Sequence, residues 1–311
     1  MRSKTSALGI RIIFMGTPDY AKVILDRLIQ TPDTDVIAVY TQPDKPVGRK
    51  KIMTPPQVKT LALQNSIDVY QPNRLREEET VKELLKLKCD YIIVAAYGQI
   101  LPREILDHAP CINLHASILP EYRGASPIQQ TLLNGDKQTG VTAMFMEEGL
   151  DTGDIIKIDT IDVSDDEMVE SLFNRLTDVA ADLTIDVLEN YSSFTAVPQD
   201  DSLSTHCSKI TKADGEVEFL NAVTLYNKYR AFTPWPGIYL NSGLKLKKIS
   251  LEDKTSINAV GKILKIDSDS IVIGCVEGSV RLHTVQAPSK KEIDVVSYIN
   301  GKRLNLADTL S

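Results

Sequence analysis

An apolar run breaks into a polar loop at Cys111-Ile112-Asn113-Leu114-His115-Ala116-Ser117-Ile118-Leu119-Pro120, which is followed by Glu121-Tyr122-Arg123-Gly124. Asn113 and His115 are two residues apart, so on a strand their side chains leave the same face. An amide donor and an imidazole at the end of a buried strand could form the wall of a ligand site. The alternative is a strand-end histidine that only bonds to a neighbouring loop, because isolated Asn-x-His pairs are common by chance.

The segments before this stretch alternate between apolar strands and amphipathic helices. This alternation predicts an α/β domain with an open, Rossmann-like parallel sheet that binds ligands at its carboxyl edge. After Gly16, Thr17 is expected to cap a helix and Pro18 to be its first residue. The second and third glycines of a dinucleotide fingerprint are missing, which argues against a nicotinamide cofactor. The expected strands are 10–15, 36–40, 67–70 and 91–96, and the expected helices are 20–29, 57–65, 77–87 and 100–106.

Two further strands are expected after the polar loop. Residues 140–146 and 155–161 are both apolar and should pair as a hairpin or at the edge of the sheet. The turn between them contains Asp151, and glycines on either side permit a tight turn that could aim this carboxylate inward. An amphipathic helix over 168–188 is expected to close the domain.

The rest of the chain has a different pattern. Residues 196–209 lose periodicity and are expected to link a catalytic domain, 1–195, to a C-terminal domain, 210–311. A helix over 221–232 and the turn Thr233-Pro234-Trp235-Pro236-Gly237 precede about five short strands with glycine-rich turns. This spacing predicts a small β-barrel of the oligonucleotide-binding-like type.

Composition excludes several classes of protein. The chain has 311 residues, of which 42% are hydrophobic and 25% charged, as in ordinary globular proteins. It has no apolar run of the length of a membrane span, and residues 8–14 indicate a first strand rather than a signal peptide. The four cysteines form no Cys-x-x-Cys pair, so neither a disulfide framework nor a metal site is expected. We therefore expect a cytoplasmic protein.

The net charge of −7 is unevenly distributed. Residues 209–311 carry 15 Lys and Arg against 11 Asp and Glu, whereas residues 1–208 carry 20 against 31. A basic C-terminal part indicates a polyanionic partner, although an accidental surface imbalance would give the same numbers.

A basic loop is expected over residues 41–53. It follows the second strand, at the edge where open α/β sheets bind ligands, and its prolines and glycine predict irregular backbone. Arg49, Lys50 and Lys51 could contact the phosphates of a nucleic acid. The alternative is a solvated loop that binds nothing.

Together these segments carry a family resemblance. Residues 113–120 closely resemble the Asn-x-His-x-Ser-Leu-Leu-Pro signature of folate-dependent formyltransferases, and residues 123–129 continue it. Residues 150–154, Leu-Asp-Thr-Gly-Asp, are similar to the aspartate loop of that family. Residues 14–21, the basic loop and residues 232–237 resemble the branch of the family that formylates methionyl-tRNA. The departures are Ala116 in place of Gly, Ile118 in place of Leu, Ser126 in place of Ala, and a basic loop one residue shorter after Arg49.

The resemblance implies a reaction and its catalytic residues. The reaction transfers the formyl group of 10-formyltetrahydrofolate to the α-amino group of methionyl initiator tRNA, releases tetrahydrofolate and needs no metal. Asn113 would donate to the oxyanion, His115 would act as general acid and base, and Asp151 would orient His115.

The resemblance also implies two sets of binding residues, in a protein that we expect to be a monomer. The folate would be bound by the loop that follows the signature strand and by the end of a neighbouring strand: Ser117, Ile118, Leu119, Pro120, Tyr97 and Gly98. The tRNA would be contacted by the basic loop, through Arg49, Lys50 and Lys51, and by the C-terminal barrel.

Two other functions remain open at this point. One is a formyltransferase that acts on a small amine such as an amino-sugar. An enzyme that formylates charged initiator tRNA and not amino-sugars would exclude this function. The other is a catalytically silent RNA-binding protein. The complete set of Asn113, His115 and Asp151 speaks against the second.

Overall fold

The computed structural model describes residues 9–48 and 50–310, and the chain divides into two compact units. The units do not follow the order of the chain. The first contains the chain up to Gly124, Gln138–Asp162 and Phe173–Cys207, and the second contains Ala125–Lys137, Val163–Leu172 and the chain from Ser208. The domain boundaries expected at 195 and 210 stay a prediction.

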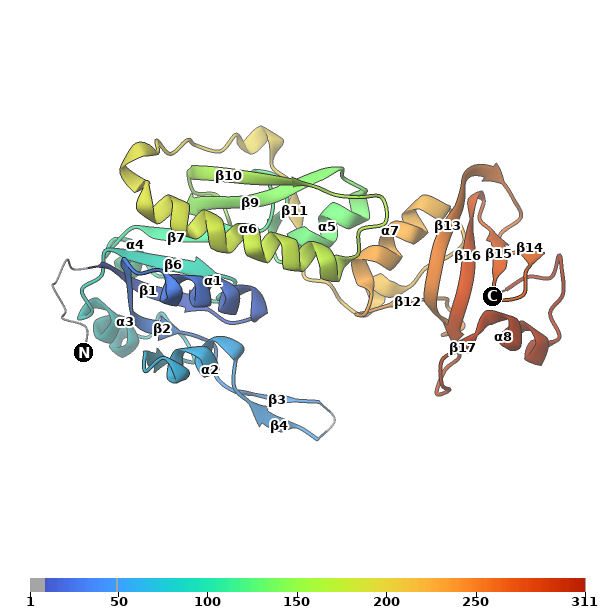
Figure 1. Ribbon diagram of the computed structural model, residues 1–311, viewed down its shortest axis with the longest axis horizontal. Coiled ribbons are helices and arrows are strands. Elements are labelled where there is room, and N and C mark those ends of the chain that lie inside the picture. Colours follow the sequence, from blue (N-terminus) through green and yellow to red (C-terminus); the bar gives the residue numbers. More distant parts are fainter. Residues whose placement is uncertain (1–8, 49, 311) are drawn as a thin grey trace. The chain divides into compact units, whose positions relative to one another are not determined.

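A seven-stranded sheet forms the centre of the first unit (Figure 1). Its strands are β1 (Ile10–Gly16), β2 (Thr34–Tyr40), β5 (Asp68–Tyr70), β6 (Tyr91–Ala95), β7 (Cys111–His115), β9 (Gln138–Phe145) and β10 (Ile155–Asp162). Their order across the sheet is β10-β9-β7-β6-β1-β2-β5. Strands β1, β2, β5, β6 and β7 run parallel, whereas β9 pairs antiparallel with β7 and with β10 at one edge. The predicted open α/β sheet and its edge pair are confirmed.

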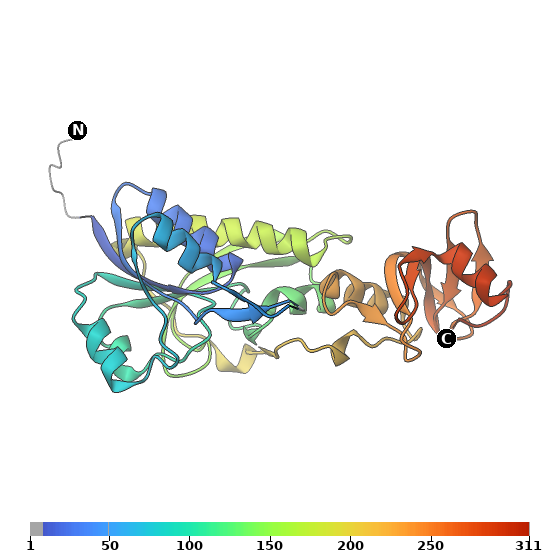
Figure 2. The ribbon, with the colours of Figure 1, turned by 90° about the horizontal axis from the view of Figure 1, so that it is seen from below.

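Helices cover both faces of this sheet (Figure 2). One face carries α1 (Asp19–Gln30), α2 (Gln57–Gln64) and α6 (Val169–Glu189), and the other carries α3 (Glu78–Leu85) and α4 (Arg103–Leu106). Successive side chains of β1 point to opposite faces of the sheet. Ile13 and Met15 belong to the core under α3 and α4, while Ile12 and Phe14 are equally buried on the opposite face.

The start of α1 differs from the prediction. Pro18, not Thr17, occupies the N-cap position, and no side chain caps this helix. The Thr17 hydroxyl instead donates to the carbonyl of Tyr97 at 3.3 Å and accepts from the backbone N–H of Gln42 at 3.3 Å. This hydroxyl connects the segments that follow β1, β2 and β6, so it is not available to cap α1.

The basic loop contains regular structure that the sequence did not predict. β3 (Lys45–Val47) and β4 (Ile52–Thr54) form an antiparallel hairpin that projects from the sheet in Figure 1. Every side chain of the two strands is exposed, so no alternation of apolar residues marks them. Pro46 is tolerated because a two-stranded ribbon consists only of edges.

Much of the expected linker is packed into the first unit. β11 (His206–Cys207) runs parallel to β8 (Arg123–Gly124), directly after the signature loop. Val197 exchanges backbone hydrogen bonds of 2.9 Å with Ile155 at the start of β10. Short 3₁₀ helices lie at Tyr191–Ser193 and Asp201–Leu203.

The second unit combines helices with an antiparallel sheet. Its strands are β12 (Ile238–Tyr239), β13 (Lys245–Ile257), β14 (Ile263–Ile266), β15 (Ile271–Gly274), β16 (Glu277–Gln286) and β17 (Ile293–Asp294), and its helices are α5 (Pro127–Asn134), α7 (Ala222–Phe232) and α8 (Val295–Lys302). A 3₁₀ turn, Ala213–Gly215, precedes α7. Of the small β-barrel expected here, the antiparallel strand sheet is confirmed. Among the described residues its pairing follows the path β12-β13-β16-β15-β14, with β17 added beside β16, and does not close into a ring.

A buried arginine joins the helices of the second unit. Arg230 of α7 donates to the carbonyl oxygens of Leu132, Ser164 and Glu167 at 3.5, 3.5 and 3.2 Å, and to Asn227 Oδ1 at 2.6 Å. Burial lowers the pKa of its guanidinium from the ordinary value. The arginine thus satisfies carbonyl groups near the end of α5 and before α6.

Candidate active site

The signature residues lie at the carboxyl end of β7, where an open α/β sheet binds its ligands. β7 runs between the parallel β6 and the antiparallel β9, so its backbone is hydrogen-bonded on both sides. Asn113 and His115 share one face of the strand and are 8% and 6% exposed. Two polar side chains are therefore held almost out of water on a rigid element.

Asp151 joins the two signature residues. Its Oδ1 accepts from Asn113 Nδ2 at 3.4 Å, and its Oδ2 lies 3.6 Å from His115 Nδ1. The backbone N–H of Gly124 donates to the same Oδ2 at 2.9 Å. The three residues expected to be catalytic thus form one connected group, although they come from two separate parts of the chain.

The backbone of Asp151 is itself in the left-handed region, with φ of +54°. The neighbouring glycines were expected to make the turn possible, but the aspartate adopts the unfavourable conformation. An L-residue in this region costs about 1 kcal/mol or more, and such strain persists only where the surroundings fix the backbone. The turn is therefore held in place by its contacts.

His115 has a partner at each ring nitrogen. Nε2 lies 2.9 Å from the carbonyl oxygen of Tyr122. Because a carbonyl only accepts, Nε2 carries a proton, and the neutral ring then presents the lone pair of Nδ1 towards Asp151. A proton taken up at Nδ1 would lie between the ring and the carboxylate. This arrangement suits a group that accepts and returns a proton.

The loop from Ser117 to Pro120 is fixed by internal hydrogen bonds. The Ser117 hydroxyl donates to Glu121 O at 2.6 Å, and Thr142 Oγ1 donates to Ser117 O at 2.7 Å while accepting from Leu119 N at 3.1 Å. Ser117 and Leu119 are buried, whereas Ile118 and Pro120 remain partly exposed. The Leu119–Pro120 peptide bond is cis. Ile118 and Pro120 are the members of this set that can touch a ligand with their side chains.

The expected folate contacts at the end of β6 differ in exposure. Tyr97 is 2% exposed, and its ring belongs to the core under α3 and α4. Burial raises the pKa of its hydroxyl, which has no hydrogen-bond partner among the described residues. Gly98 is exposed with φ of +78°, and a Cβ added there would meet only Gln42 Nε2, at 3.9 Å. Gly98 rather than the Tyr97 ring is therefore the accessible residue of the pair.

The expected tRNA-binding lysines lie at the tip of the β3–β4 hairpin. Lys50 and Lys51 are exposed, and Lys51 donates its backbone N–H to Gly48 O at 3.1 Å. Arg49 lies outside the described residues.

The base of the hairpin is held by Asp44. Its carboxylate accepts from Lys59 Nζ at 2.8 and 2.9 Å and from Gln71 Nε2 at 2.8 Å. These hydrogen bonds, first that of Gln71 and then that of Lys59, lower the pKa of Asp44 from its ordinary value. The hairpin therefore starts from a fixed point on the domain.

Sequence patterns indicated neither Thr142 nor Gln199 as part of this region. Thr142 is one residue of an apolar strand, and its role depends on the loop that β7 brings beside it. Gln199 lies in the non-periodic stretch taken for a linker, yet its carboxamide reaches the Asp151 turn. No local signal marks such long-range partners.

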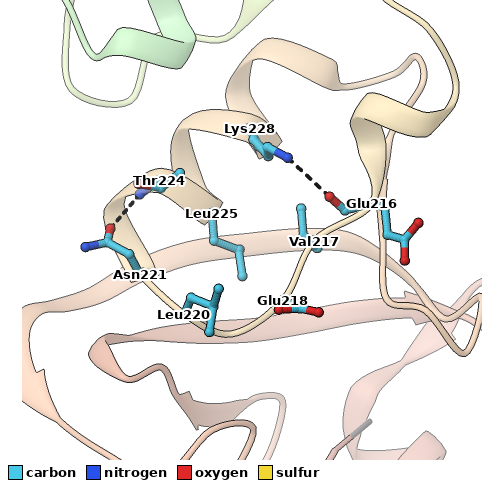
Figure 3. A pocket seen from close by; sticks show the side chains of 8 residues that line it. All are labelled: Glu216, Val217, Glu218, Leu220, Asn221, Thr224, Leu225 and Lys228. Carbon is cyan, nitrogen blue, oxygen red and sulfur yellow. Dashed lines mark hydrogen bonds between the residues drawn. The ribbon is translucent and has the colours of Figure 1, made fainter.

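A separate hollow of about 360 Å³ lies in the second unit, beside the first turns of α7 (Figure 3). Two of the polar side chains around it are already used within the unit: Lys228 donates to the carbonyl oxygens of Asp214 and Glu216, and Asn221 caps α7. The carboxylates of Glu216 and Glu218 would disfavour a phosphate or folate here. The hollow is lined by Glu216, Val217, Glu218, Leu220, Asn221, Thr224, Leu225 and Lys228.

The described residues contain no group of three or more His, Cys, Asp or Glu arranged to hold a metal ion. In the same part of the chain, no helix is long and apolar enough to cross a membrane.

The connected Asn, His and Asp lie at the carboxyl edge of an open α/β sheet, in a chain that continues into an antiparallel β domain. The formyl transferase family model matches residues 10–188, and the model of the formyl transferase C-terminal domain matches residues 209–303. A methionyl-tRNA formyltransferase of Sulfurimonas denitrificans is 68% identical over 302 residues, covering 97% of this chain and all of that protein. One from Nitratiruptor is 51% identical over 302 residues, covering 96% of this chain and 99% of that protein. The chain therefore belongs to the methionyl-tRNA formyltransferase family.

A solved structure supports the fold independently. An N-formyltransferase of Helicobacter canadensis, described in complex with folinic acid and dTDP-3-aminofucose, superposes with a TM-score of 0.67. It is 18% identical, and the match covers 88% of this chain and 99% of that one. At this identity the likeness establishes the fold alone.

Proposed function

We propose that this chain transfers the formyl group of 10-formyltetrahydrofolate to the α-amino group of methionyl initiator tRNA, giving formylmethionyl-tRNA for translation initiation. The observation that carries the proposal is the connected group of Asn113, His115 and Asp151 in a chain with relatives of that activity over nearly its whole length. The proposed location is the cytoplasm, where charged initiator tRNA is made, and the proposed state is a monomer.

The side chains of Asn113, His115 and Asp151 suit a substrate that donates a formyl group. When bound, 10-formyltetrahydrofolate supplies an electrophilic carbonyl carbon. An amide N–H, an imidazole and a carboxylate held on one sheet edge can meet a carbonyl oxygen and move a proton beside it. Around this group, the exposed Gly98 and the partly exposed Ile118 and Pro120 offer backbone and apolar surface for the folate ring.

Asn113 is proposed to stabilise negative charge on the formyl oxygen. When an amine attacks a carbonyl, the oxygen gains charge that a fixed donor stabilises without reorganising. Asn113 Nδ2 is held by Asp151 at 3.4 Å and by the rigid β7 beneath it, so its amide is already oriented. Removing one such donor costs about a hundred- to a thousand-fold in rate.

His115 and Asp151 are proposed to move the proton. The attacking nitrogen must lose a proton and the leaving nitrogen must gain one, and imidazole is the side chain best suited to both transfers near neutral pH. Asp151 faces Nδ1 at 3.6 Å and would stabilise the ring in its charged state. No covalent enzyme intermediate is needed, because a neutral amine is already a competent nucleophile.

The hairpin and the basic C-terminal part are proposed to bind the tRNA. Residues 1–208 carry an excess of acidic side chains, which repels RNA in general. Lys50 and Lys51 offer local cations at the tip of the hairpin, and Arg49 precedes them in the sequence. Phosphate contacts of this kind position a substrate without reading its sequence.

Transfer of a labelled formyl group from 10-formyltetrahydrofolate tests the proposal directly. Charged initiator methionyl-tRNA should accept the label, whereas uncharged tRNA and an aminodeoxy-sugar nucleotide should not. Asn113→Ala should lower turnover about a hundred- to a thousand-fold, and His115→Ala should abolish it, while both variants stay folded. Formylation of the sugar in place of the tRNA, or full activity of either variant, would overturn the proposal.

A second experiment tests whether the hairpin residues bind the tRNA and not the folate. Arg49→Ala, and separately the double change of Lys50 and Lys51 to Ala, should raise KM for the tRNA while folate affinity stays within twofold. Lys22→Ala, a partly exposed lysine of α1, is the control for loss of positive charge away from the hairpin. A parallel loss of folate affinity in the hairpin variants would contradict the assignment.

A further inference from the structure

The catalytic aspartate lies on a turn that another side chain holds from outside the family signature. Gln199 Nε2 donates to the carbonyl oxygens of Asp151 and Gly153 at 2.9 and 2.8 Å. One carboxamide thus bonds to both sides of the turn that carries the Asp151 carboxylate. This turn includes the left-handed backbone of Asp151, which depends on such contacts to persist.

The orientation of the Gln199 carboxamide is fixed by Arg123. Gln199 Oε1 accepts from Arg123 Nε at 3.0 Å and from Nη2 at 2.8 Å. A guanidinium has no acceptor, and a backbone carbonyl has no donor. Rotating the amide by half a turn would therefore lose the hydrogen bonds on both sides at once, so only one orientation is allowed.

Arg123 is held as firmly as the glutamine that it orients. It is 3% exposed, and its Nη2 also donates to Asp201 Oδ1 at 2.8 Å. Its backbone lies in β8, where its N–H donates to Thr205 O at 2.9 Å. The next residue, Gly124, donates its N–H to the Asp151 carboxylate. Asp151 is therefore fixed twice from this strand: at its carboxylate by Gly124, and at its backbone through Arg123 and Gln199.

The same segment supports the partner of His115. The N–H of Tyr122, whose carbonyl faces His115 Nε2, donates to Thr205 Oγ1 at 2.9 Å. Residues 199–207 therefore form hydrogen bonds with both residues, Tyr122 and Asp151, that face the nitrogens of the histidine ring.

We propose that Gln199, oriented by Arg123, is a positioning residue for formyl transfer: it holds the Asp151 turn so that the carboxylate stays in register with His115 and Asn113. The proposal rests on the catalytic role proposed above for Asp151. Gln199 is proposed to act only through that residue.

Gln199→Glu is the single substitution that tests this role most directly. The carboxylate keeps the size of the side chain and still accepts from Arg123, but it cannot donate to the carbonyls of Asp151 and Gly153. A displacement of about 1 Å in a catalytic group costs on the order of a hundredfold. We expect kcat to fall by about 10- to 100-fold, while KM for methionyl-tRNA, folate affinity and the unfolding midpoint stay near wild type. Asp200→Asn, the neighbouring exposed residue that bonds only within its own segment, is the matched control and should leave kcat unchanged.

A double-mutant cycle with Asp151→Asn separates positioning from a merely structural role. If Gln199 acts through the Asp151 carboxylate, the glutamate variant should cost little further activity once that carboxylate is gone. An equal loss of kcat in the two backgrounds, or no loss in the wild-type background, would overturn the proposal. An Asp151→Asn variant with full activity would instead overturn the role proposed for Asp151.

Arg123→Lys provides a second, milder variant for the case in which the glutamate variant does not fold. Lysine keeps the charge near Asp201 but cannot give Gln199 two donors in one plane. Its effect on kcat should be smaller and should vanish in the same Asp151→Asn background. A loss that persists there would count against the proposal.

Discussion

Replacing Gly153 with alanine would displace the Asp151 turn by a purely steric route. A Cβ at residue 153 would lie 2.8 Å from the carbonyl carbon of Phe145 and still closer to its oxygen, whereas ordinary contacts begin at 3.4 Å. Residue 153 and the Phe145 carbonyl must therefore move apart by more than half an ångström. Phe145 ends β9, which is paired on both sides in the sheet. The turn, which is held at fewer points, should move instead.

The size of the effect follows from that displacement. A shift approaching 1 Å in a catalytic group lowers the rate by about a hundredfold, or about 2.7 kcal/mol in the activation free energy. The overpacking itself should cost about 1–3 kcal/mol of stability, which a two-domain enzyme of this size can lose and stay folded.

Steady-state formyl transfer, measured beside urea unfolding, checks this expectation. The variant should fold and bind folate, with kcat/KM about a hundredfold below wild type. Gly301→Ala is the control, because a Cβ there meets nothing within 4 Å and the residue lies in α8. A Gly153→Ala enzyme with kcat/KM within threefold of wild type would refute the view that the turn sets the position of Asp151.

Three further outcomes are expected. Arg230→Met should lower the free energy of unfolding by about 2–4 kcal/mol, because it leaves buried carbonyl groups without donors, and urea titration measures this loss. Asn221→Ala should cost about 1 kcal/mol in the same titration, since its side chain caps α7 by accepting from a backbone N–H at 2.9 Å. Burial raises the pKa of Cys89 and Cys275 to about 11 and that of Cys111 to about 12, so these groups are neutral thiols at pH 8. A thiol-reactive disulfide reagent should therefore label the buried Cys111 and Cys275 slowly in the native protein and rapidly in urea, and fast native labelling of either would contradict its burial.

The sequence predicted those features that depend on local periodicity. The two-residue spacing of Asn113 and His115 placed both on one face because a strand repeats every two residues. The buried strands and amphipathic helices were likewise found within a few residues of their bounds, since each has its own apolar pattern. The apolar run 155–161 was correctly placed beside 140–146 because the two are close in sequence.

The features that were missed depend on contacts between distant segments. The β3–β4 hairpin has exposed side chains, so only its backbone pairing defines it, and its prolines indicated irregular structure. Thr17 is a residue type that often caps helices, but its hydroxyl is hydrogen-bonded to Tyr97 and Gln42. Gln199 lies in a stretch without periodicity, and its role exists only because β11 brings that stretch beside β8.

The division of the chain into two units also limits how this enzyme can be shortened. A fragment that stops at residue 188, where the first family model ends, would lack Gln199 and β11 and leave the buried Arg123 guanidinium without its acceptors. A fragment that stops at Cys207 keeps both but separates α5 from α7, because residues 125–137 belong with the C-terminal unit. No single cut yields two self-sufficient halves, so loss of activity after deletion of the C-terminal part would not by itself measure its contribution to tRNA binding.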